Sequence, residues 1–256
     1  MWEANAARLG AGTEQRLTDN MLEIASRTRP LRRSGLAEYV YETVKDSILD
    51  GLFKPSESIP VDTLSNELGV SRQPVMDALK RLSLEGFVVI LPQVGCHVRE
   101  YSAREITDFF RLFAEGEALI ASLIAERATN NEIAVLEEIS AKIGKLQDLK
   151  EDPEVISRKY RLLNRKLHYE MRSVSQSAPL AEVVETLGDR SDFFIATAHR
   201  PLFADRLARA HSEHEEIIAA FKARDAEQAS AVMKTHILHV EERIRGVFNA
   251  SRVVSD

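Results

Sequence analysis

Several features that are common in other classes of protein are scarce or missing in this sequence. It has one cysteine in 256 residues, Cys96, which excludes an intrachain disulfide framework and a metal site built from cysteines alone. No apolar run approaches the roughly 18 residues that a membrane-spanning helix needs. The first twenty residues also lack the charged start and apolar middle of a signal peptide. We therefore expect a cytoplasmic protein without a membrane partner.

A surplus of basic residues is missing as well. The chain has 34 Lys and Arg against 40 Asp and Glu, which gives a formal net charge of -6. Proteins that bind nucleic acid non-specifically usually carry a basic surplus. Any DNA-binding function must therefore come from local features. The 44% of hydrophobic residues are enough for one large domain or two ordinary ones.

The first 34 residues lack sustained periodicity. They end in the arginine-rich stretch RTRPLRRSG, which contains Arg27, Arg29, Arg32 and Arg33. We expect a flexible arm over residues 1–34, which could contact DNA phosphates. A charge run of this kind is more often a solvated tail, so both alternatives stay open.

Residues 35–101 have the pattern of a winged helix-turn-helix. Val40, Val44 and Ile48 recur every fourth residue and predict a helix that ends near Gly51. The segment VDTLSNELG predicts a second, shorter helix, and SRQPVMDALKRLSLEG predicts a third. Two β-rich runs, FVVIL and CHVR, predict a two-stranded wing on either side of the turn PQVG.

The third helix and the wing hold the candidate DNA contacts. A helix held by a tight turn against its predecessor can present its first residues to the major groove. Ser71, placed to cap this helix, and the next two residues occupy that end, and a glycine at the wing tip allows close approach to DNA. A solvated helix start is the alternative, because short helical hairpins are common. The candidate contacts are Ser71, Arg72, Gln73, Met76, Lys80, Gly95 and His97.

The remainder of the chain predicts helix nearly throughout. Ser102 with Glu105, and Thr129 with Glu132, have the spacing of capping boxes. Asp152 before a proline marks a further helix start, and Asp225 marks another. We expect roughly six helices over residues 102–250, an all-helical bundle followed by a short tail over 251–256. The predicted fold class is therefore mainly α.

Four polar residues of this bundle indicate a metal site. Asn164 and His168 are four residues apart and share one side of a helix, while His214 and His236 belong to two later helices. Neutral imidazoles with one amide oxygen suit zinc, nickel, manganese or a similar divalent metal, and the pattern does not choose among them. From spacing alone, scattered surface histidines are the alternative.

These segments together resemble the GntR-type bacterial regulators. The segments VYETVKDSILDGLFKP, LSNELGVSRQPVMDALKRLSLEGFV and GCHV are similar to the winged helix of that family. Two positions depart from it: Ser56 stands where the family usually has a glycine, and Met76 where it usually has an arginine. The segments NRKLHYEM, SAPL and EHEEIIAAFKARDAEQASAVMKTHILHV resemble the ligand-binding (FCD) domain of the FadR-like branch over residues 102–248.

The resemblance implies a homodimeric transcription regulator, more often a repressor, that binds a double-stranded DNA operator and responds to a small carboxylate effector. It also implies that Asn164, His168, His214 and His236 hold a divalent metal and that Arg111 faces the effector pocket. Asn164 departs from the more usual aspartate. An amide oxygen is a weaker, uncharged ligand that leaves the site more positive, which should favour an anionic effector.

Two other classes of protein stay open. A metal-dependent hydrolase would also need a nearby carboxylate as general base, and the helix around His168 offers only Glu170, off that face. We therefore do not expect an enzyme. A helical ligand-binding protein with weakened DNA affinity is the second alternative, motivated by Met76 and the acidic balance.

Overall fold

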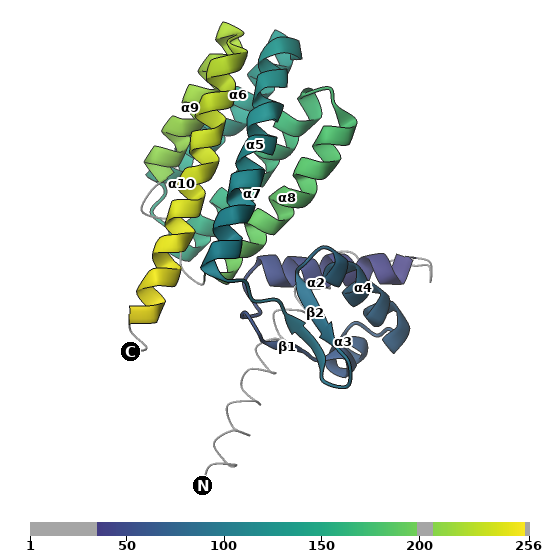
Figure 1. Cartoon of the computed structure of the whole chain (residues 1–256). Coiled ribbons are helices and arrows are strands. Elements are labelled where there is room, and N and C mark those ends of the chain that lie inside the picture. The colour runs from purple at the N-terminus through teal and green to yellow at the C-terminus, as the bar shows by residue number, and fades with distance from the viewer. Residues whose placement is uncertain (1–34, 199–206, 254–256) are drawn as a thin grey trace. The chain divides into compact units, whose positions relative to one another are not determined.

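The computed structural model describes residues 35–198 and 207–253, with side chains through residue 246. The chain divides between Glu100 and Tyr101 into two compact units, both drawn in Figure 1. The predicted arm over residues 1–34, with its arginines, lies outside the described residues.

Three helices form the framework of the first unit, as predicted. They are α2 (Leu36–Leu49), α3 (Val61–Glu67) and α4 (Arg72–Leu84). Each helix turns its apolar side inward, and α4 packs against both of the others. The side chains at the centre are at most 1% exposed, and they include Val40, Val44, Ile48, Leu64, Val75, Leu79 and Leu82. This core holds α4 firmly from one side and leaves its other side for contacts.

Ser71 occupies the N-cap position of α4, where the sequence placed it. Its backbone is extended there, with φ of -75° and ψ of 167°, but its side chain makes no cap hydrogen bond. The start of the helix is therefore confirmed, whereas the cap bond expected of Ser71 does not form.

The wing has one strand more than the sequence predicted. β2 (Val88–Leu91) and β3 (Gly95–Val98) form the expected hairpin, and β1 (Ser58–Ile59) pairs antiparallel with β3, so the strand order is β1-β3-β2. Two residues are too few to show the period-2 alternation that marks a strand in sequence. β1 is a strand only because β3 lies next to it.

Ser56, one of the two departures from the family pattern, lies just before β1 with a φ of +63°. This is the left-handed region, which glycine adopts without cost and other residues adopt with strain. The Ser56 hydroxyl donates to Oε2 of Glu100 at 2.6 Å, and its backbone N–H donates to the carbonyl of Val98 at 3.0 Å. These two bonds hold the strained turn in place.

Over residues 101–198 and 207–253 the second unit has six α-helices and one short 3-10 helix, which confirms the predicted all-helical class. A 3-10 turn, η2 (Lys145–Asp148), follows the second of them, and the last one continues through residues 251–253, where a tail was expected. The six are α5 (Ala103–Arg127), α6 (Asn130–Gly144), α7 (Pro153–Val174), α8 (Ala178–Thr197), α9 (Leu207–Ala223) and α10 (Ala226–Val253).

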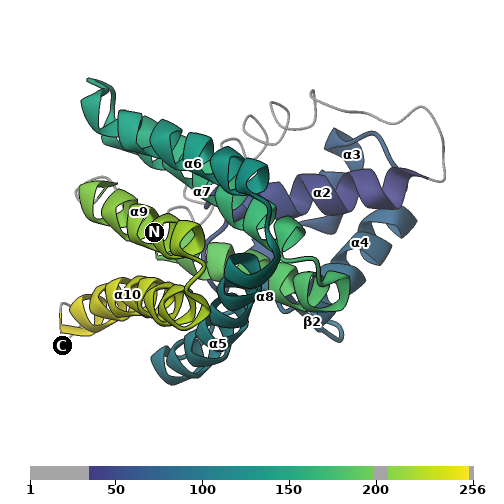
Figure 2. The same ribbon diagram turned by 90° about the horizontal axis from the view of Figure 1, so that it is seen from above.

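These six helices pack in a closed ring. Following the contacts, the order is α5, α10, α9, α6, α7, α8 and back to α5. Figure 2 shows α6, α9, α10 and α5 following one another along one side of the bundle. The centre is apolar, with Phe110, Ile124, Leu136, Phe221 and Met233 at 0% exposed. Among the described helices, none is both long and apolar enough to cross a membrane.

The helix starts predicted in this unit are confirmed with their hydrogen bonds. Ser102 and Thr129 each form a complete capping box with the glutamate three residues later. The carboxylates of Asp152 and Asp225 accept backbone N–H groups at the starts of α7 and α10. Each such cap stabilises a helix by about 1 kcal/mol, so the ends of α5, α6, α7 and α10 are fixed locally by the sequence.

Candidate functional site

Three histidines from three helices meet inside the second unit. They are His168 on α7, His214 on α9 and His236 on α10, and one ring nitrogen from each lies within 4.8 Å of the others. All three are buried, with 6%, 0% and 2% of their surface exposed. The structure thus brings together the three histidines that the sequence singled out.

Three ring nitrogens of this histidine cluster lack the hydrogen bonds that buried polar atoms normally make. Neither nitrogen of His214 has a hydrogen-bond partner among the described residues, and Nδ1 of His168 has none either, although Oε2 of Glu117 lies 3.5 Å from it. Burial, together with the neighbouring His236 and His168, holds the pKa of His214 well below its usual value. A neutral, desolvated imidazole with a free lone pair is the form that binds a divalent metal such as zinc.

A carboxylate next to the histidine cluster fixes the orientation of His236. Nδ1 of His236 lies 2.8 Å from Oε2 of Glu213, and Nδ1 of His239 lies 2.8 Å from Oε1 of the same carboxylate. Burial by itself would raise the pKa of Glu213, but the hydrogen bonds from His236 and His239 outweigh it and lower the pKa to about 2. An ionised carboxylate that accepts the Nδ1–H of His236 leaves Nε2 as its ligand atom, which is common behind metal-binding histidines.

A second buried carboxylate lies beside His168. Glu117 of α5 is fully buried, with Oε2 3.5 Å from Nδ1 of His168 and Oε1 accepting a 2.6 Å bond from Nη1 of Arg172. Burial opposes its ionisation, yet the adjacent His168 and Arg172 keep the pKa of Glu117 below its ordinary value. Arg172 also donates from Nε to Glu185 at 2.6 Å. The histidine cluster therefore has a charged, hydrogen-bonded surrounding on two sides.

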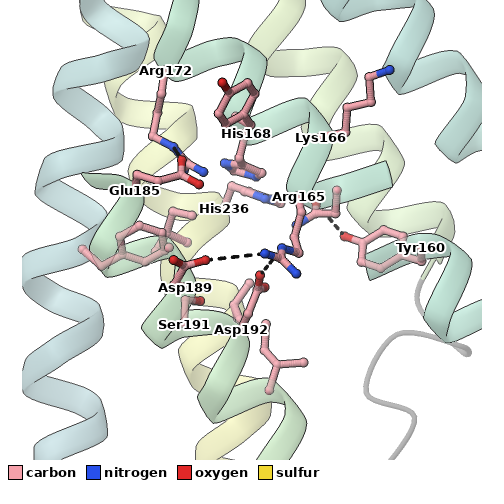
Figure 3. Close-up of a pocket in the computed structure, with 17 residues that line it drawn as sticks. Tyr160, Arg165, Lys166, His168, Arg172, Glu185, Asp189, Ser191, Asp192 and His236 are labelled. Carbon is pink, nitrogen blue, oxygen red and sulfur yellow. Dashed lines mark hydrogen bonds and ion pairs between the residues drawn. The ribbon is translucent and has the colours of Figure 1, made fainter. Parts of the chain in front are cut away.

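A cavity of about 250 Å³ lies beside His168 and His236, between α7, α8 and α10 (Figure 3). Asn164 lines the same cavity, and its Oδ1 accepts a bond from the Tyr160 hydroxyl at 3.3 Å. The fourth residue of the predicted ligand set thus lines the cavity together with His168 and His236. A small molecule in this space would contact both the histidine cluster and the polar walls of α7 and α8.

Arg111 is not where the sequence comparison with the family placed it. Its side chain is 72% exposed, lies 3.7 Å from Asp108, and does not line the cavity. The reason is helical phase. Phe110, Phe113 and Ala114 form the buried side of α5, so Arg111 faces solvent. The expectation that Arg111 faces the effector pocket is therefore wrong for this structure.

The predicted DNA-contacting residues of α4 share its exposed side. Ser71, Arg72, Gln73 and Lys80 are exposed, and Met76 is half-buried. The first turn of a helix carries backbone N–H groups that favour an anion such as phosphate. The structure thus presents these five side chains together on the surface of the first unit.

An acidic residue, Asp77, lies among these side chains and was missed in the sequence. Its Oδ1 accepts a 2.9 Å bond from Nε2 of Gln73 and lies 3.4 Å from Nζ of Lys80. Arg72 is 3.2 Å from Asp62 of α3. The only available signal was spacing, since position 77 is four residues after 73 and three before 80. Three of the predicted contacts are therefore already paired with carboxylates in the free protein.

The two predicted contacts of the wing differ in exposure. Gly95 is exposed, has a φ of +126°, and would meet nothing within 4 Å if it carried a Cβ. His97 lies in the middle of β3 and is half-buried, with Nδ1 3.4 Å from the carbonyl of Ser56. The wing tip is thus open at Gly95, whereas His97 contacts the strained turn before β1.

Two carboxylates at the centre of the site, Glu117 and Glu213, were not predicted. For Glu117 a signal existed, because it interrupts the apolar side of α5 between Ala114 and Ala121. For Glu213 the signal was its place beside His214 in the sequence. The expectation against a metal-dependent hydrolase rests on the lack of a suitable carboxylate near the histidines in the sequence. The structure places two carboxylates there, although both are bound by other side chains.

Comparisons with known proteins agree with both units. The family model of the FCD domain matches residues 111–239, and the model of bacterial regulatory proteins of the gntR family matches residues 36–98. The Nta operon transcriptional regulator of Aminobacter aminovorans is 29% identical over 187 residues, covering 72% of this chain and 83% of the relative. The transcriptional repressor GlaR of Escherichia coli is 26% identical over 200 residues, covering 77% of this chain and 90% of the relative.

Two solved structures share the fold. E. coli McbR/YncC has a TM-score of 0.69 at 22% identity, covering 84% of this chain and 98% of that chain. A putative GntR transcriptional regulator from Rhodococcus sp. RHA1 has a TM-score of 0.65 at 18% identity, covering 82% of this chain and 97% of that chain. Taken with the matched family models, the evidence assigns this chain to the gntR family of bacterial regulatory proteins, as a transcriptional regulator with an FCD domain.

Proposed function

We propose that this regulator is a cytoplasmic homodimer that represses a metabolic operon and responds to a small carboxylate bound next to a divalent metal. The observation that carries the proposal is the buried cluster of His168, His214 and His236, which contains ring nitrogens without a hydrogen-bond partner and two of whose members, His168 and His236, line a cavity. A repressing role is supported by GlaR, a relative that is itself a repressor.

The metal would be held by the three histidines and by Asn164 on the cavity side. Such an ion supplies a positive centre that attracts a carboxylate. The chain's own residues prepare the site. Glu213 holds His236 in one orientation, and Glu117 links His168 to Arg172. With Asn164 in place of an aspartate, the ligand set is uncharged, so we expect weaker metal binding than in relatives with a carboxylate ligand.

DNA binding would use the exposed side of α4 and the tip of the wing. In the free protein Asp77 and Asp62 hold Gln73, Lys80 and Arg72. These exposed pairs are weak, so phosphates and base edges can replace the carboxylates at little cost. The two acidic side chains also reduce non-specific attraction to DNA, which is consistent with a chain of net charge -6.

A second copy of the chain would pack against exposed apolar side chains of the second unit. Leu112 and Leu119 are seven residues apart on one face of α5, at 62% and 49% exposed, and Val183 on α8 is 60% exposed. Apolar residues clustered on a surface often mark an interface. A symmetric dimer would present two copies of α4 to a pseudo-palindromic operator with half-sites about one helical turn apart.

The effector would act by differential affinity. A ligand shifts an equilibrium only if it binds the DNA-competent and DNA-incompetent forms unequally. Most of the cavity wall comes from α7, α8 and α10, so ligand contacts with these helices can favour one packing of the bundle over another.

The test combines metal analysis with DNA binding. Purified protein should contain close to one divalent ion per chain, and it should retard a fragment of its own upstream DNA in a gel-shift assay. His214→Ala should remove the metal and the ligand response. The matched control is His211→Ala, one turn earlier on α9, which should retain the metal. Full metal occupancy in the His214→Ala protein, or no retardation of upstream DNA, would contradict the proposal.

A further inference from the structure

The two arginines that line the cavity are each held by two carboxylates. Arg172 donates to Glu117 and Glu185, both at 2.6 Å, and only 6% of its surface is exposed. The guanidinium also lies against Gly188 of α8, where an added Cβ would be 3.3 Å from Nη1. A ligand carboxylate could bind Arg172 only by displacing a buried, charge-assisted bond, which is costly. Arg172 is therefore a structural part of the wall rather than an open anion site.

Arg165 shows the same pattern on the other side of the cavity. Its Nε lies 3.0 Å from Asp192 and its Nη2 lies 3.6 Å from Asp189 (Figure 3). Both aspartates come from α8 and are largely buried, with side chains 16% and 17% exposed. Lys166 also lines the cavity, but its side chain extends away from them (Figure 3). Two carboxylates of α8 therefore line this part of the cavity beside one guanidinium.

The raised pKa of Asp192 is consistent with a wall that can accept a cationic group. Burial raises its pKa to about 6, and the nearby Arg165 does not fully offset that effect, while Asp189 adds to it. Arg161 and His168 also lower the pKa of Asp192, but by smaller amounts than Arg165. A buried carboxylate whose charge is only partly compensated by its neighbours would gain from a cationic group on a ligand.

Another part of the cavity lining has different chemistry. His168 and His236 line the cavity as well, and only 6% and 2% of their surface is exposed. In the proposed function these histidines hold the metal, which attracts a carboxylate. The cavity thus offers a group for an anion and a wall for a cation, and at about 250 Å³ it suits a small metabolite.

We propose that the effector is a small zwitterion, a carboxylic acid that also carries a protonated amine, and that Asp189 and Asp192 bind its ammonium group. This inference rests on the proposed function for the carboxylate end. It replaces the expectation of a simple anion. That expectation rested on the uncharged metal ligand Asn164, whereas in the structure each of the two arginines that line the cavity lies beside two carboxylates. An ammonium group carries three donors and can bond to both aspartates.

The test is isothermal titration calorimetry on the full-length, zinc-loaded protein with matched ligands. Each pair differs only in an amine or a hydroxyl at one carbon: alanine with lactate, aspartate with malate, and glutamate with 2-hydroxyglutarate. At least one amino acid should bind at least 10-fold more tightly than its hydroxy acid. Asp192→Asn should weaken amino-acid binding about 10- to 100-fold, since it removes a charged hydrogen-bond partner. The affinity for the hydroxy acid should not fall.

Two controls keep the outcome clear. Asp189→Asn provides a second, independent variant of the same wall, and Glu182→Gln changes an exposed carboxylate on α8 that does not line the cavity. The inference is overturned if hydroxy acids bind as tightly as amino acids, or if neither series binds. A gel-shift assay with the same ligands separates the two proposals. Release of operator DNA by hydroxy acids alone would contradict the zwitterionic effector but agree with the proposed function. Failure of the protein to bind DNA would contradict the proposed function, and calorimetry would still decide which class of ligand binds.

Discussion

Oε2 of Glu213 accepts a hydrogen bond of 2.8 Å from Nδ1 of His236, which fixes the ring of a proposed metal ligand through the opposite nitrogen. Partners of this kind typically contribute 10- to 100-fold to metal affinity. We expect Glu213→Gln to weaken zinc binding by about that factor, measured by competition with a chelator. Glu216→Gln, an exposed neighbour on α9, should bind zinc like the wild type. Equal zinc affinity in the wild type and both variants would show that Glu213 orients His239 and not the metal ligand His236.

Asp192 should make stability depend on pH. Its pKa is about 6 in the folded protein and near 3.8 in the unfolded chain, with burial as the main cause. The folded state then holds the proton more strongly, so stability falls as pH rises from about 4 to 6. Asp192→Asn removes this loss. Its stability advantage over the wild type should be small at pH 4 and grow to at most about 3 kcal/mol at pH 7.

The measurement is urea unfolding of both proteins at a series of pH values. The matched control is Asp108→Asn, whose side chain is 59% exposed on α5. If the difference between Asp192→Asn and the wild type does not change with pH, Asp192 is solvated rather than buried. A gain in stability together with loss of ligand response would be the behaviour expected of a binding residue.

Ser56 should show the cost of its left-handed backbone. Ser56→Ala loses the bond to Glu100 and keeps the φ of +63°, whereas Ser56→Gly loses the same bond and relieves the strain. We expect the glycine variant to be more stable than the alanine variant by about 1 kcal/mol. Chemical denaturation of the two proteins measures this difference directly. Equal stability would mean that the turn carries no strain.

Substitution of Met76 should change the DNA sequence that the protein prefers. Methionine cannot donate a hydrogen bond, while an arginine at this position could contact a guanine, and such a contact is worth roughly 1 to 3 kcal/mol of discrimination. We expect Met76→Arg to restore affinity for a typical family half-site and to alter the motif recovered from random DNA. Arg72→Ala should abolish specific binding.

The selection needs one fixed salt concentration, because phosphate contacts depend strongly on salt. Leu84→Arg is the matched control, since it adds the same charge at an 89% exposed position at the other end of α4. It should raise non-specific affinity without changing the motif. Identical motifs from wild type and Met76→Arg would show that position 76 does not contact base edges.

The sequence by itself determined the helices and the two strands of the hairpin, and several of the helix starts. Helix periodicity, capping residues such as Ser102 and Asp152, and the turn around Gly95 act over a few residues, so their effect can be recognised without tertiary contacts. The same local spacing put His168 next to Asn164 on α7 and separated His214 from His236.

Only the tertiary structure decided what surrounds the histidine cluster. Glu117 comes from α5 and Glu185 from α8, and both reach Arg172 only because these helices pack beside α7. The strand β1 and the outward direction of Arg111 were likewise fixed by packing. Charge balance in a buried cavity is a sum over residues that are distant in sequence, and burial sets the strength of each contribution. For this reason the sequence suggested an anionic effector, whereas the zwitterion that we propose rests on carboxylates that only the folded chain brings to the cavity.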